Sequence, residues 1–538
     1  MAVCAELSQL QHIEPSRFIS FSFPNPLLHD ASNPYGNADD HAELLRVAVI
    51  DSPAPAAPSP PSPRTAAMLV PAGRHCDWIF STRAGQLHLL LSSRSQCTIS
   101  RLILVGPEIP APSPRVVRCA AARPDPDPAR ARLLPLLLAL CPRAAFGNGA
   151  IPDVPLLSFH DDLLRLVPVQ VVAGPVVGEM LVEDVAVDCA PGPAELRRRL
   201  RFKRMPCLIQ TQVRLARPMS AAAAAASSSL LEALEEGPAS SLQPEVGGPL
   251  VQPYLQAMVA GLALIDSSVE ENARSGARPR CLCAGVGGGA LPMSIRVGLG
   301  FDVLGVEADC VVLDVARNYF GLVEDEFLHV RVGDAIQMVQ DFAHGDEPDS
   351  KFSAIMVDLD SPDAMCGVSA PPLEMTHRSI LLAARRILHH HGVLVLNVIP
   401  PAADASFYKG LIDVLHQVFS ELHEIDVGNG ENFVLVARVS PTESTLLDSS
   451  RLFRTELRKL TGDFLERAYD HEDCSVLPTI VRHCFKFSLV IRLSYYTSIG
   501  FYGPNICGRV KEEKDDKDDD DDGSDVGDFA VLSAFFGP

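Results

Sequence analysis

The chain has little of what a nucleic-acid-binding, secreted or membrane protein carries. Its 538 residues include 46 basic and 67 acidic side chains, a formal net charge of -21, whereas binding to phosphates needs a basic footprint. No apolar stretch of about 18 residues stands outside a globular context, and no basic segment followed by an apolar core opens the sequence as in a secretory signal. We therefore expect a cytoplasmic protein whose primary partner is neither nucleic acid nor a membrane.

The sequence also lacks the cysteine and histidine spacing of a metal site. Its 14 cysteines are scattered, and Cys281 and Cys283 lie inside an apolar run, where a free cysteine behaves as a small hydrophobe. This pair has no second pair at ligand spacing. The three histidines at 389–391 fall at an expected helix end, where polar or cationic residues suit the carbonyl dipole. We expect no metal and a reducing compartment.

A glycine-rich turn between two apolar runs is the most informative feature that is present. The run at 280–284 leads into Gly285, Gly287 and Gly289, and a second run ends at Glu307, twenty-two residues after Gly285. This pattern indicates a buried strand, a glycine turn, a helix and a second strand closed by a carboxylate. The glycines allow the backbone to approach a ligand and to point N–H groups at it, and Glu307 stands where the hydroxyls of a ribose could be accepted.

Two further acids continue the series. Asp334 follows a third apolar run and Asp358 ends a fourth, which favours a nucleoside-binding crevice at the carboxyl ends of a parallel sheet. Gly285, Gly287 and Ala290 also satisfy the dinucleotide fingerprint, so a nicotinamide dehydrogenase has to be considered. An acid such as Asp334 suits an adenine amino group, however, and the dinucleotide fold does not require it.

The far end of this region favours one fold class. Residues 420–427 and 432–439 are two strand-like runs joined by Gly428-Asn-Gly-Glu, a hairpin signal. Such a closing hairpin is usual in S-adenosylmethionine-dependent methyltransferases. We predict an α/β, Rossmann-like, seven-stranded sheet with a closing antiparallel hairpin, preceded by a smaller mostly β domain. A degenerate, non-catalytic version of this fold stays open.

Composition suggests how the rest of the chain is organised. Residues 52–64 hold six prolines in thirteen residues, which favours an extended linker, and runs such as 87–91, 100–105 and 167–172 resemble short strands. The expected parts are a proline-rich amino-terminal segment at 1–65, a mostly β domain at 66–217, a low-complexity linker at 218–249, the methyltransferase domain at 250–440, a helical extension at 441–484 and an irregular acidic tail at 485–538.

Several stretches carry a specific resemblance. Gly285-Val-Gly-Gly-Gly-Ala-Leu-Pro, the strand end at 305–309, Val357-Asp-Leu-Asp-Ser-Pro-Asp and Gly392-Val-Leu-Val-Leu-Asn resemble the carboxyl-terminal, spermidine-synthase-like domain of the elongation factor 1-alpha lysine and N-terminal methyltransferase family. Residues 77–86 and 202–212 resemble the segment that precedes that domain. The likeness is strong in the second half of the chain and weak in the first.

The resemblance implies a cofactor, a reaction and site residues. The cofactor would be S-adenosylmethionine, and the acceptor an amino-terminal amine of a protein such as elongation factor 1-alpha. The implied cofactor contacts are the methionine end for Gly285, Gly287 and Gly289, the ribose for Glu307 and the adenine for Asp334 and Ala335. The implied catalytic residues are Asp358, beside the methionine ammonium and the incoming substrate, and Asp360, facing the acceptor amine. Asp360 also fits a plain turn acid, because Ser361 and Pro362 follow it. His377 and Asn397 are weaker candidates on the substrate side.

Two departures from related patterns limit these implications. No second series of glycines and acids precedes residue 250, so the lysine methylation assigned to an additional amino-terminal domain in dual-activity members is not implied. Spermidine synthases carry an acid inside the glycine loop, whereas Gly287-Gly-Gly-Ala-Leu-Pro has none. An aminopropyltransferase and a non-catalytic scaffold are the alternatives.

Overall fold

The computed structural model describes most of the chain up to residue 467. The described residues are 10–28, 43–53, 64–93, 99–108, 117–118, 126–159, 161–189, 191–216, 242–345, 351–361, 370–400, 405–428, 432–441 and 452–467. Most of the proline-rich stretch, most of the low-complexity linker and all of the expected acidic tail lie outside these ranges. No described helix is long and apolar enough to cross a bilayer.

The first part of the chain forms a five-stranded sheet in the order β1-β2-β4-β3-β6. Its strands are β1 (Phe18–Pro24), β2 (Leu44–Asp51), β3 (Arg64–Leu69), β4 (Ile99–Pro107) and β6 (Leu156–Leu157), with helices α2 (Trp78–Ser81), α3 (Arg83–Ser93) and α4 (Pro126–Ala139). β2 is an inner strand because it pairs with β1 on one side and β4 on the other. Two strands therefore lie within residues 1–65, and position 66 does not mark the start of the folded chain.

Residues 87–91 correct a second expectation. They read as a strand but belong to α3, with Leu89 and Leu90 fully buried. A short apolar run suits a buried helix as well as a strand, and periodicity alone does not separate the two.

A six-stranded antiparallel sheet follows, in the order β11-β10-β9-β8-β7-β5. Its strands are β5 (Val117–Arg118), β7 (Leu163–Gly174), β8 (Gly178–Val187), β9 (Glu195–Phe202), β10 (Ile209–Ala216) and β11 (Gln243–Pro244). The single mostly β domain expected at 66–217 thus corresponds to two sheets.

The six-stranded sheet takes part in an unusual group of buried charges. Arg199 and Arg201 of β9 both contact Glu183 of β8, and Arg201 also pairs with Asp77, the residue that caps α2. Arg74 pairs with Asp77 and Asp161 at 2.7 and 2.6 Å. We call these six residues, Arg74, Asp77, Asp161, Glu183, Arg199 and Arg201, the buried arginine cluster.

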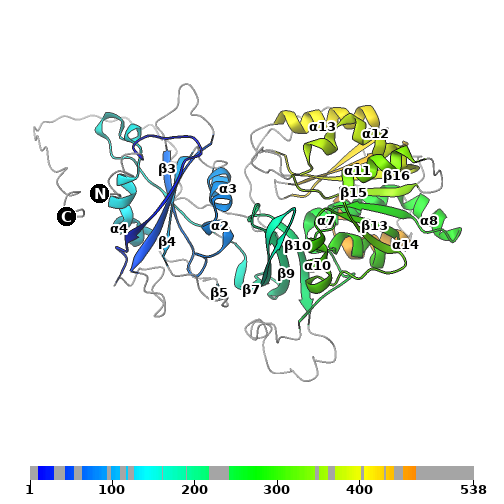
Figure 1. Ribbon diagram of the computed structural model, residues 1–538, viewed down its shortest axis with the longest axis horizontal. Coiled ribbons are helices and arrows are strands. Elements are labelled where there is room, and N and C mark those ends of the chain that lie inside the picture. The colour runs from blue at the N-terminus through cyan, green and yellow to red at the C-terminus, as the bar shows by residue number, and fades with distance from the viewer. Residues whose placement is uncertain are drawn as a thin grey trace, which may run out of the picture. The chain divides into compact units, whose positions relative to one another are not determined.

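The second half of the chain forms a seven-stranded sheet in the order β14-β13-β12-β15-β16-β18-β17 (Figure 1). Its strands are β12 (Arg280–Ala284), β13 (Asp302–Glu307), β14 (Leu328–Val332), β15 (Phe352–Val357), β16 (Leu388–Val398), β17 (Glu421–Asp426) and β18 (Phe433–Arg438). The first five run parallel, and β18 pairs antiparallel with β16 and β17. This is the predicted sheet with its closing hairpin.

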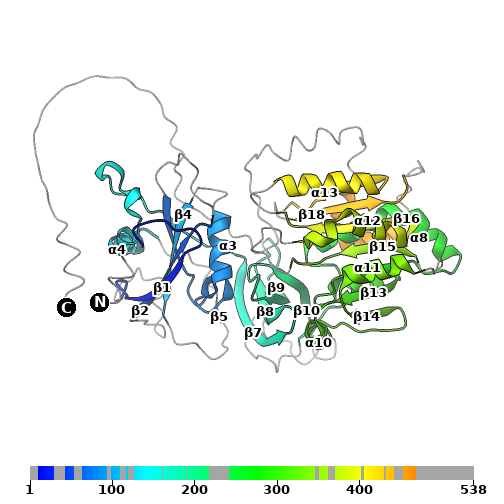
Figure 2. The same ribbon diagram turned by 45° about the horizontal axis from the view of Figure 1, so that its top comes forward.

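Helices cover both faces of this sheet, which is why its central strands are apolar throughout. One face packs against residues of α7 (Pro253–Ala260), α8 (Asp266–Arg274), α9 (Ala290–Met293), α10 (Cys310–Tyr319), α14 (Leu452–Thr461) and α15 (Phe464–Arg467). The other packs against α11 (Ala335–His344), α12 (Arg378–Ile387) and α13 (Ala405–Val418), on the opposite side of the strands in Figures 1 and 2. Helix α14 falls within the predicted helical extension. The short turns are η1 (Arg143–Ala145), η2 (Gly147–Gly149), η4 (Gly261–Ile265), η5 (Ser294–Gly298) and η8 (Leu373–Thr376).

Candidate active site

The carboxyl ends of four parallel strands bring the predicted residues to one edge of the sheet. Gly285 follows β12, Glu307 ends β13, and Asp358 follows β15. Asp334 comes two residues after β14. Because parallel strands point the same way, residues far apart in sequence meet where the strands end.

The glycine turn depends on the absence of side chains. Gly285 has a φ of +89°, and a Cβ there would lie 2.1 Å from the carbonyl oxygen of Asp358. Gly289, at φ +88°, precedes helix α9. The expectation that these N–H groups face a ligand is wrong in one respect: Gly285 donates to Val306, Gly289 to Val286 and Gly287 to Glu307. The turn brings strand ends together rather than offering free donors.

Glu307 holds this turn from the neighbouring strand. Its Oε2 accepts N–H bonds from Val286 and Gly287, each 3.1 Å long, and Oε1 accepts a longer bond of 3.3 Å from Asp309. The residue is only 9% exposed. Burial raises the pKa of Glu307, although these N–H groups act in the opposite direction.

Asp334 and Ala335 begin helix α11. Asp334 is exposed and caps the helix, because its Oδ1 accepts the N–H groups of Ile336 and Gln337 at 2.8 and 3.3 Å. Ala335 is buried in the core beneath it. Asp334 therefore has a structural task as an N-cap in addition to the adenine role that the resemblance implies.

Asp358 is fixed from two sides. Its Oδ1 accepts a bond of 2.9 Å from Asn397 on β16, and its Oδ2 accepts one of 3.2 Å from the hydroxyl of Tyr254 on α7. Asn397 in turn accepts from Asn432 at 2.9 Å, and Tyr254 from Gln252 at 3.3 Å. Burial raises the pKa of Asp358 to about 6, with Glu307 adding to the rise and the two hydrogen bonds opposing it.

The pKa of Asp360 is shifted further from its ordinary value than that of Asp358. Burial raises its pKa to about 7, while Arg204 opposes the rise and Asp358 adds to it. The Asp360 side chain is 21% exposed, and its Oδ2 lies 3.5 Å from the Arg204 guanidinium. That oxygen is buried and accepts no hydrogen bond among the described residues. Arg204 also donates to the Ser361 carbonyl at 2.8 Å, which holds the loop after β15.

The preceding six-stranded sheet contributes to the same edge through β10. The N–H of Gly288 donates to Thr211 Oγ1 at 2.7 Å, and the N–H of Gln212 donates to Gln252 Oε1 at 3.0 Å. Sequence reasoning missed Tyr254, Gln252 and Thr211 as site residues, although 202–212 carried part of the resemblance. His377, a weaker candidate, is exposed and precedes α12.

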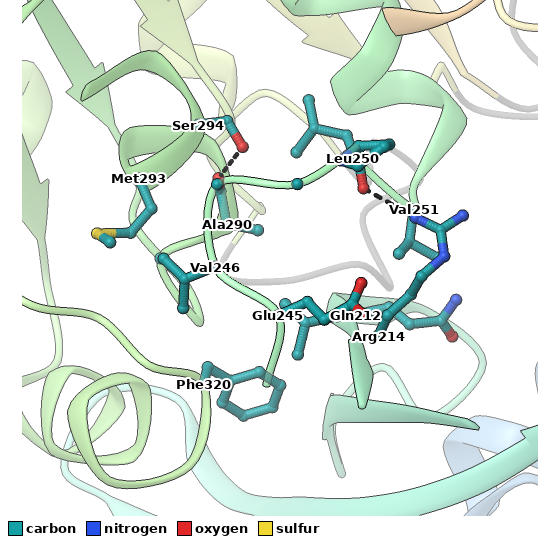
Figure 3. A pocket seen from close by; sticks show the side chains of 15 residues that line it. Gln212, Arg214, Glu245, Val246, Leu250, Val251, Ala290, Met293, Ser294 and Phe320 are labelled. Atoms are coloured by element: carbon teal, nitrogen blue, oxygen red, sulfur yellow. Dashed lines mark hydrogen bonds between the residues drawn. The ribbon is translucent and has the colours of Figure 1, made fainter. Parts of the chain in front are cut away.

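A nearby cavity is not the predicted crevice. Figure 3 shows this space of about 30 Å³, lined by residues that include Gln212, Arg214 and Phe320. It is large enough for water but far too small for a nucleoside. None of Glu307, Asp334, Asp358 and Asp360 lines it. Among the described residues, no group of three His, Cys, Asp or Glu side chains could hold a metal ion.

Strand order and site geometry together define the class. The parallel strands, the closing hairpin and the acids at successive strand ends form the α/β fold of S-adenosylmethionine-dependent methyltransferases, and the predicted fold class is confirmed.

Sequence comparison confirms the more specific resemblance. No family model matches the chain. It is similar to the eEF1A lysine and N-terminal methyltransferase of Danio rerio, with 29% identity over 367 residues, 68% of this chain and 49% of that protein. The Homo sapiens protein of the same name is 26% identical over 405 residues, 73% of this chain and 54% of that protein. The chain thus spans about half the length of these curated relatives.

Two solved structures are also similar to parts of this chain. Human methyltransferase-like protein 13 in complex with SAH is 26% identical, with a TM-score of 0.34, and the match covers 42% of this chain and 98% of that one. A probable spermidine synthase from Corynebacterium glutamicum is 14% identical, with a TM-score of 0.36, and the match covers 55% of this chain and 87% of that one.

Proposed function

We propose that this chain is an S-adenosylmethionine-dependent protein methyltransferase that acts on an amino-terminal amine. The names of its relatives point to elongation factor 1-alpha as the acceptor. The observation that carries the proposal is the group of Glu307, Asp358 and Asp360 at the ends of β13 and β15, the strands on either side of β12, where burial raises the pKa of all three carboxyl groups.

The residues at this edge fit the cofactor. Glu307 lies beside the glycine turn at the end of the second strand, where a ribose diol could donate to it. Asp358 is held in one orientation by Tyr254 and Asn397 and would face the methionine ammonium. When bound, S-adenosylmethionine supplies a methyl group that its sulfonium has already activated.

Asp360 suits the acceptor side of the reaction. Its side chain is 21% exposed at the edge where the strands end, so an incoming ammonium can pair with its carboxylate. A carboxyl with a pKa of about 7 can also take a proton from the amine near neutral pH. An α-amine, with a pKa of about 7.7–8.0, gives up its proton far more readily than a lysine at about 10.4. These values favour a terminal amine over a lysine.

The direct test supplies purified full-length chain with labelled S-adenosylmethionine and a peptide with a free amino terminus. An otherwise identical acetylated peptide is the control. We expect label on the free peptide alone, at a rate that rises with pH towards the α-amine pKa because only the neutral amine attacks. Incubation with a cytosolic extract then identifies the labelled protein.

Other outcomes would contradict parts of this proposal. Equal labelling of both peptides would indicate a lysine or another acceptor. Calorimetric binding of S-adenosylmethionine without any transfer, to peptide or extract, would favour the non-catalytic scaffold. Preference for decarboxylated S-adenosylmethionine and a diamine would indicate aminopropyl transfer instead.

A further inference from the structure

A second cavity lies at the edge of the seven-stranded sheet opposite the acids. It has a volume of about 360 Å³, and its lining includes Lys351, Arg385, Arg386 and His390 together with apolar side chains such as Leu382 and Val439. Lys351 precedes β15, the two arginines are in the last turn of α12, and His390 is near the start of β16. These elements begin or end at the amino edge of the parallel strands.

The lining is cationic. Among the residues that the structure describes, no acidic side chain borders the cavity. Lys351, Arg385 and Arg386 are exposed and form no ion pair with any described residue. Arg74, Arg101 and Arg201, by contrast, each contact a carboxylate. Burial first, and then the nearby charges of Lys351 and Arg280, lower the pKa of His389 beside the cavity.

His390 lines this cavity, and none of the three histidines forms the helix cap predicted from sequence. Helix α12 ends at Ile387, and residues 389–391 belong to β16. The imidazole of His390 contacts Ser440 Oγ at 3.0 Å. The carbonyl dipole of α12 favours cations at its end. That dipole explains Arg385 and Arg386, but not Lys351 on the neighbouring strand.

We propose that this cavity binds an acidic peptide segment of a partner protein. Carboxylates spaced along an extended peptide can meet Lys351 and the two arginines, while Leu382, which is 38% exposed, and Val439 offer contact to an apolar residue between the acids. Charged side chains around an apolar centre are the arrangement of a protein-binding surface. A long polyanion such as nucleic acid is disfavoured by the chain's net charge of -21.

This surface is separate from the proposed active site. Lys351 and Asp358 stand at opposite ends of β15, and seven steps of extended chain span roughly 20 Å. Changes at Arg385 or Arg386 should therefore leave S-adenosylmethionine binding unaltered. For this reason, an experiment can show that the peptide proposal fails while the methyltransferase proposal holds, or the reverse.

The test measures fluorescence anisotropy of a labelled, amidated pentapeptide with four acidic residues around a central leucine. Full-length chain should bind it saturably at low ionic strength, and the affinity should fall as salt screens the charges. The double variant Arg385→Ala/Arg386→Ala should bind about tenfold more weakly or worse, because rim charges set both attraction and salt dependence. Arg378→Ala, an exposed arginine at the other end of α12, is the matched control and should bind as the unchanged chain does.

Three results would overturn the proposal. One is the absence of saturable binding by the unchanged chain, and another is equal binding by the double variant. The third is a pair of results: inorganic phosphate competes completely, and a peptide whose leucine is replaced by glycine binds equally well. The cavity would then recognise a phosphate group without the apolar contact. Circular dichroism of the double variant, with calorimetric binding of S-adenosylmethionine, checks that the fold is retained.

Discussion

Two groups of buried carboxylates in this molecule behave in opposite ways. In the buried arginine cluster, burial pushes the pKa of Asp77 upwards, but Arg201 and Arg74 outweigh it and hold that pKa well below its usual range. At the strand ends of the seven-stranded sheet, burial raises the pKa of Asp360 to about 7, with one arginine 3.5 Å away. The number and closeness of the cations separate a structural ion network from an acid able to exchange protons near neutral pH.

The comparison also separates what each group contributes. The buried arginine cluster matches three arginines with three carboxylates, so removing one member leaves an uncompensated charge. The acids at the strand ends, Glu307, Asp358 and Asp360, are an excess of negative groups beside one arginine, Arg204, and Tyr254 and Asn397 hold Asp358 in place. Repulsion between these like charges lowers the stability of the folded chain, and a cationic ligand would reduce that repulsion.

The largest effect is expected from breaking the cluster. Arg201→Ala should lower the free energy of unfolding by about 3–5 kcal/mol, because Asp77 and Glu183 would stay buried without their shared cation. Arg130→Ala removes a surface partner of Asp153, which is 59% exposed, and should cost less than about 1 kcal/mol. Urea unfolding at neutral pH measures both. Similar values for the two variants would contradict the structural role of the cluster.

Next in size is the loss of transfer in Asp360→Asn. The amide keeps the size of the side chain but neither holds an ammonium nor takes its proton. Methyl transfer should fall by about 10²-fold or more, while calorimetric affinity for S-adenosylmethionine changes by less than about threefold. Full turnover by the Asn variant would remove Asp360 from the mechanism.

The same substitution tests the raised pKa through stability. The unfolded carboxyl ionises at its ordinary pKa of 3.8, whereas the folded one stays protonated up to about 7. Its charge therefore lowers stability progressively between those pH values. Asp360→Asn should match the wild type near pH 4 and be more stable by about 1–3 kcal/mol at pH 8, after allowance for partial exposure. The pKa of Asp77 is lowered instead, so its contribution to stability has the opposite pH dependence: it is present above the unfolded pKa and is lost as the pH falls. Parallel curves for wild type and Asp360→Asn would refute the shift.

A smaller change is expected in cofactor affinity when Glu307 is removed. Glu307→Ala deletes a charge-assisted bond to ribose worth roughly 1.5–3 kcal/mol, so S-adenosylmethionine should bind about tenfold more weakly or worse. Glu324→Ala, a carboxylate that pairs with Arg317, is the control and should keep the affinity. An unchanged affinity for Glu307→Ala would refute the ribose assignment.

The smallest effect should follow from Tyr254→Phe. Its hydroxyl donates to Asp358 and lowers the pKa of that acid, so its loss should displace the pH profile of transfer upwards and slow transfer several-fold, consistent with a hydrogen bond worth about 1 kcal/mol. Tyr408→Phe, which loses a bond to Glu424, should leave the profile in place. An unshifted profile in Tyr254→Phe would leave this tyrosine with a packing role alone.

The fold could be predicted from the sequence where the pattern is local. The strand and helix alternation from Arg280 to Asp358 follows from apolar runs closed by glycine or acid, and the hairpin from Gly428-Asn-Gly-Glu between two such runs. The elements of the first half of the chain were predicted less well. Residues 87–91 suit either kind of element, and β1 and β2 lie within a segment that proline content had set apart. Antiparallel pairing of β1 with β2 is a long-range choice that neither strand encodes alone.

By itself, the sequence determined the order of strands and turns and the acids that close them, because side-chain period and backbone freedom act over a few residues. The partners of those acids were decided by the tertiary structure alone. Tyr254 reaches Asp358 across 104 positions of the chain, and Thr211 reaches Gly288 across 77. The same holds for protonation. Asp77 and Asp360 are the same residue type, but two arginines lower the pKa of Asp77, whereas burial raises that of Asp360 against a single arginine. Desolvation and neighbouring charges set each pKa, and both come into being only when the chain is folded.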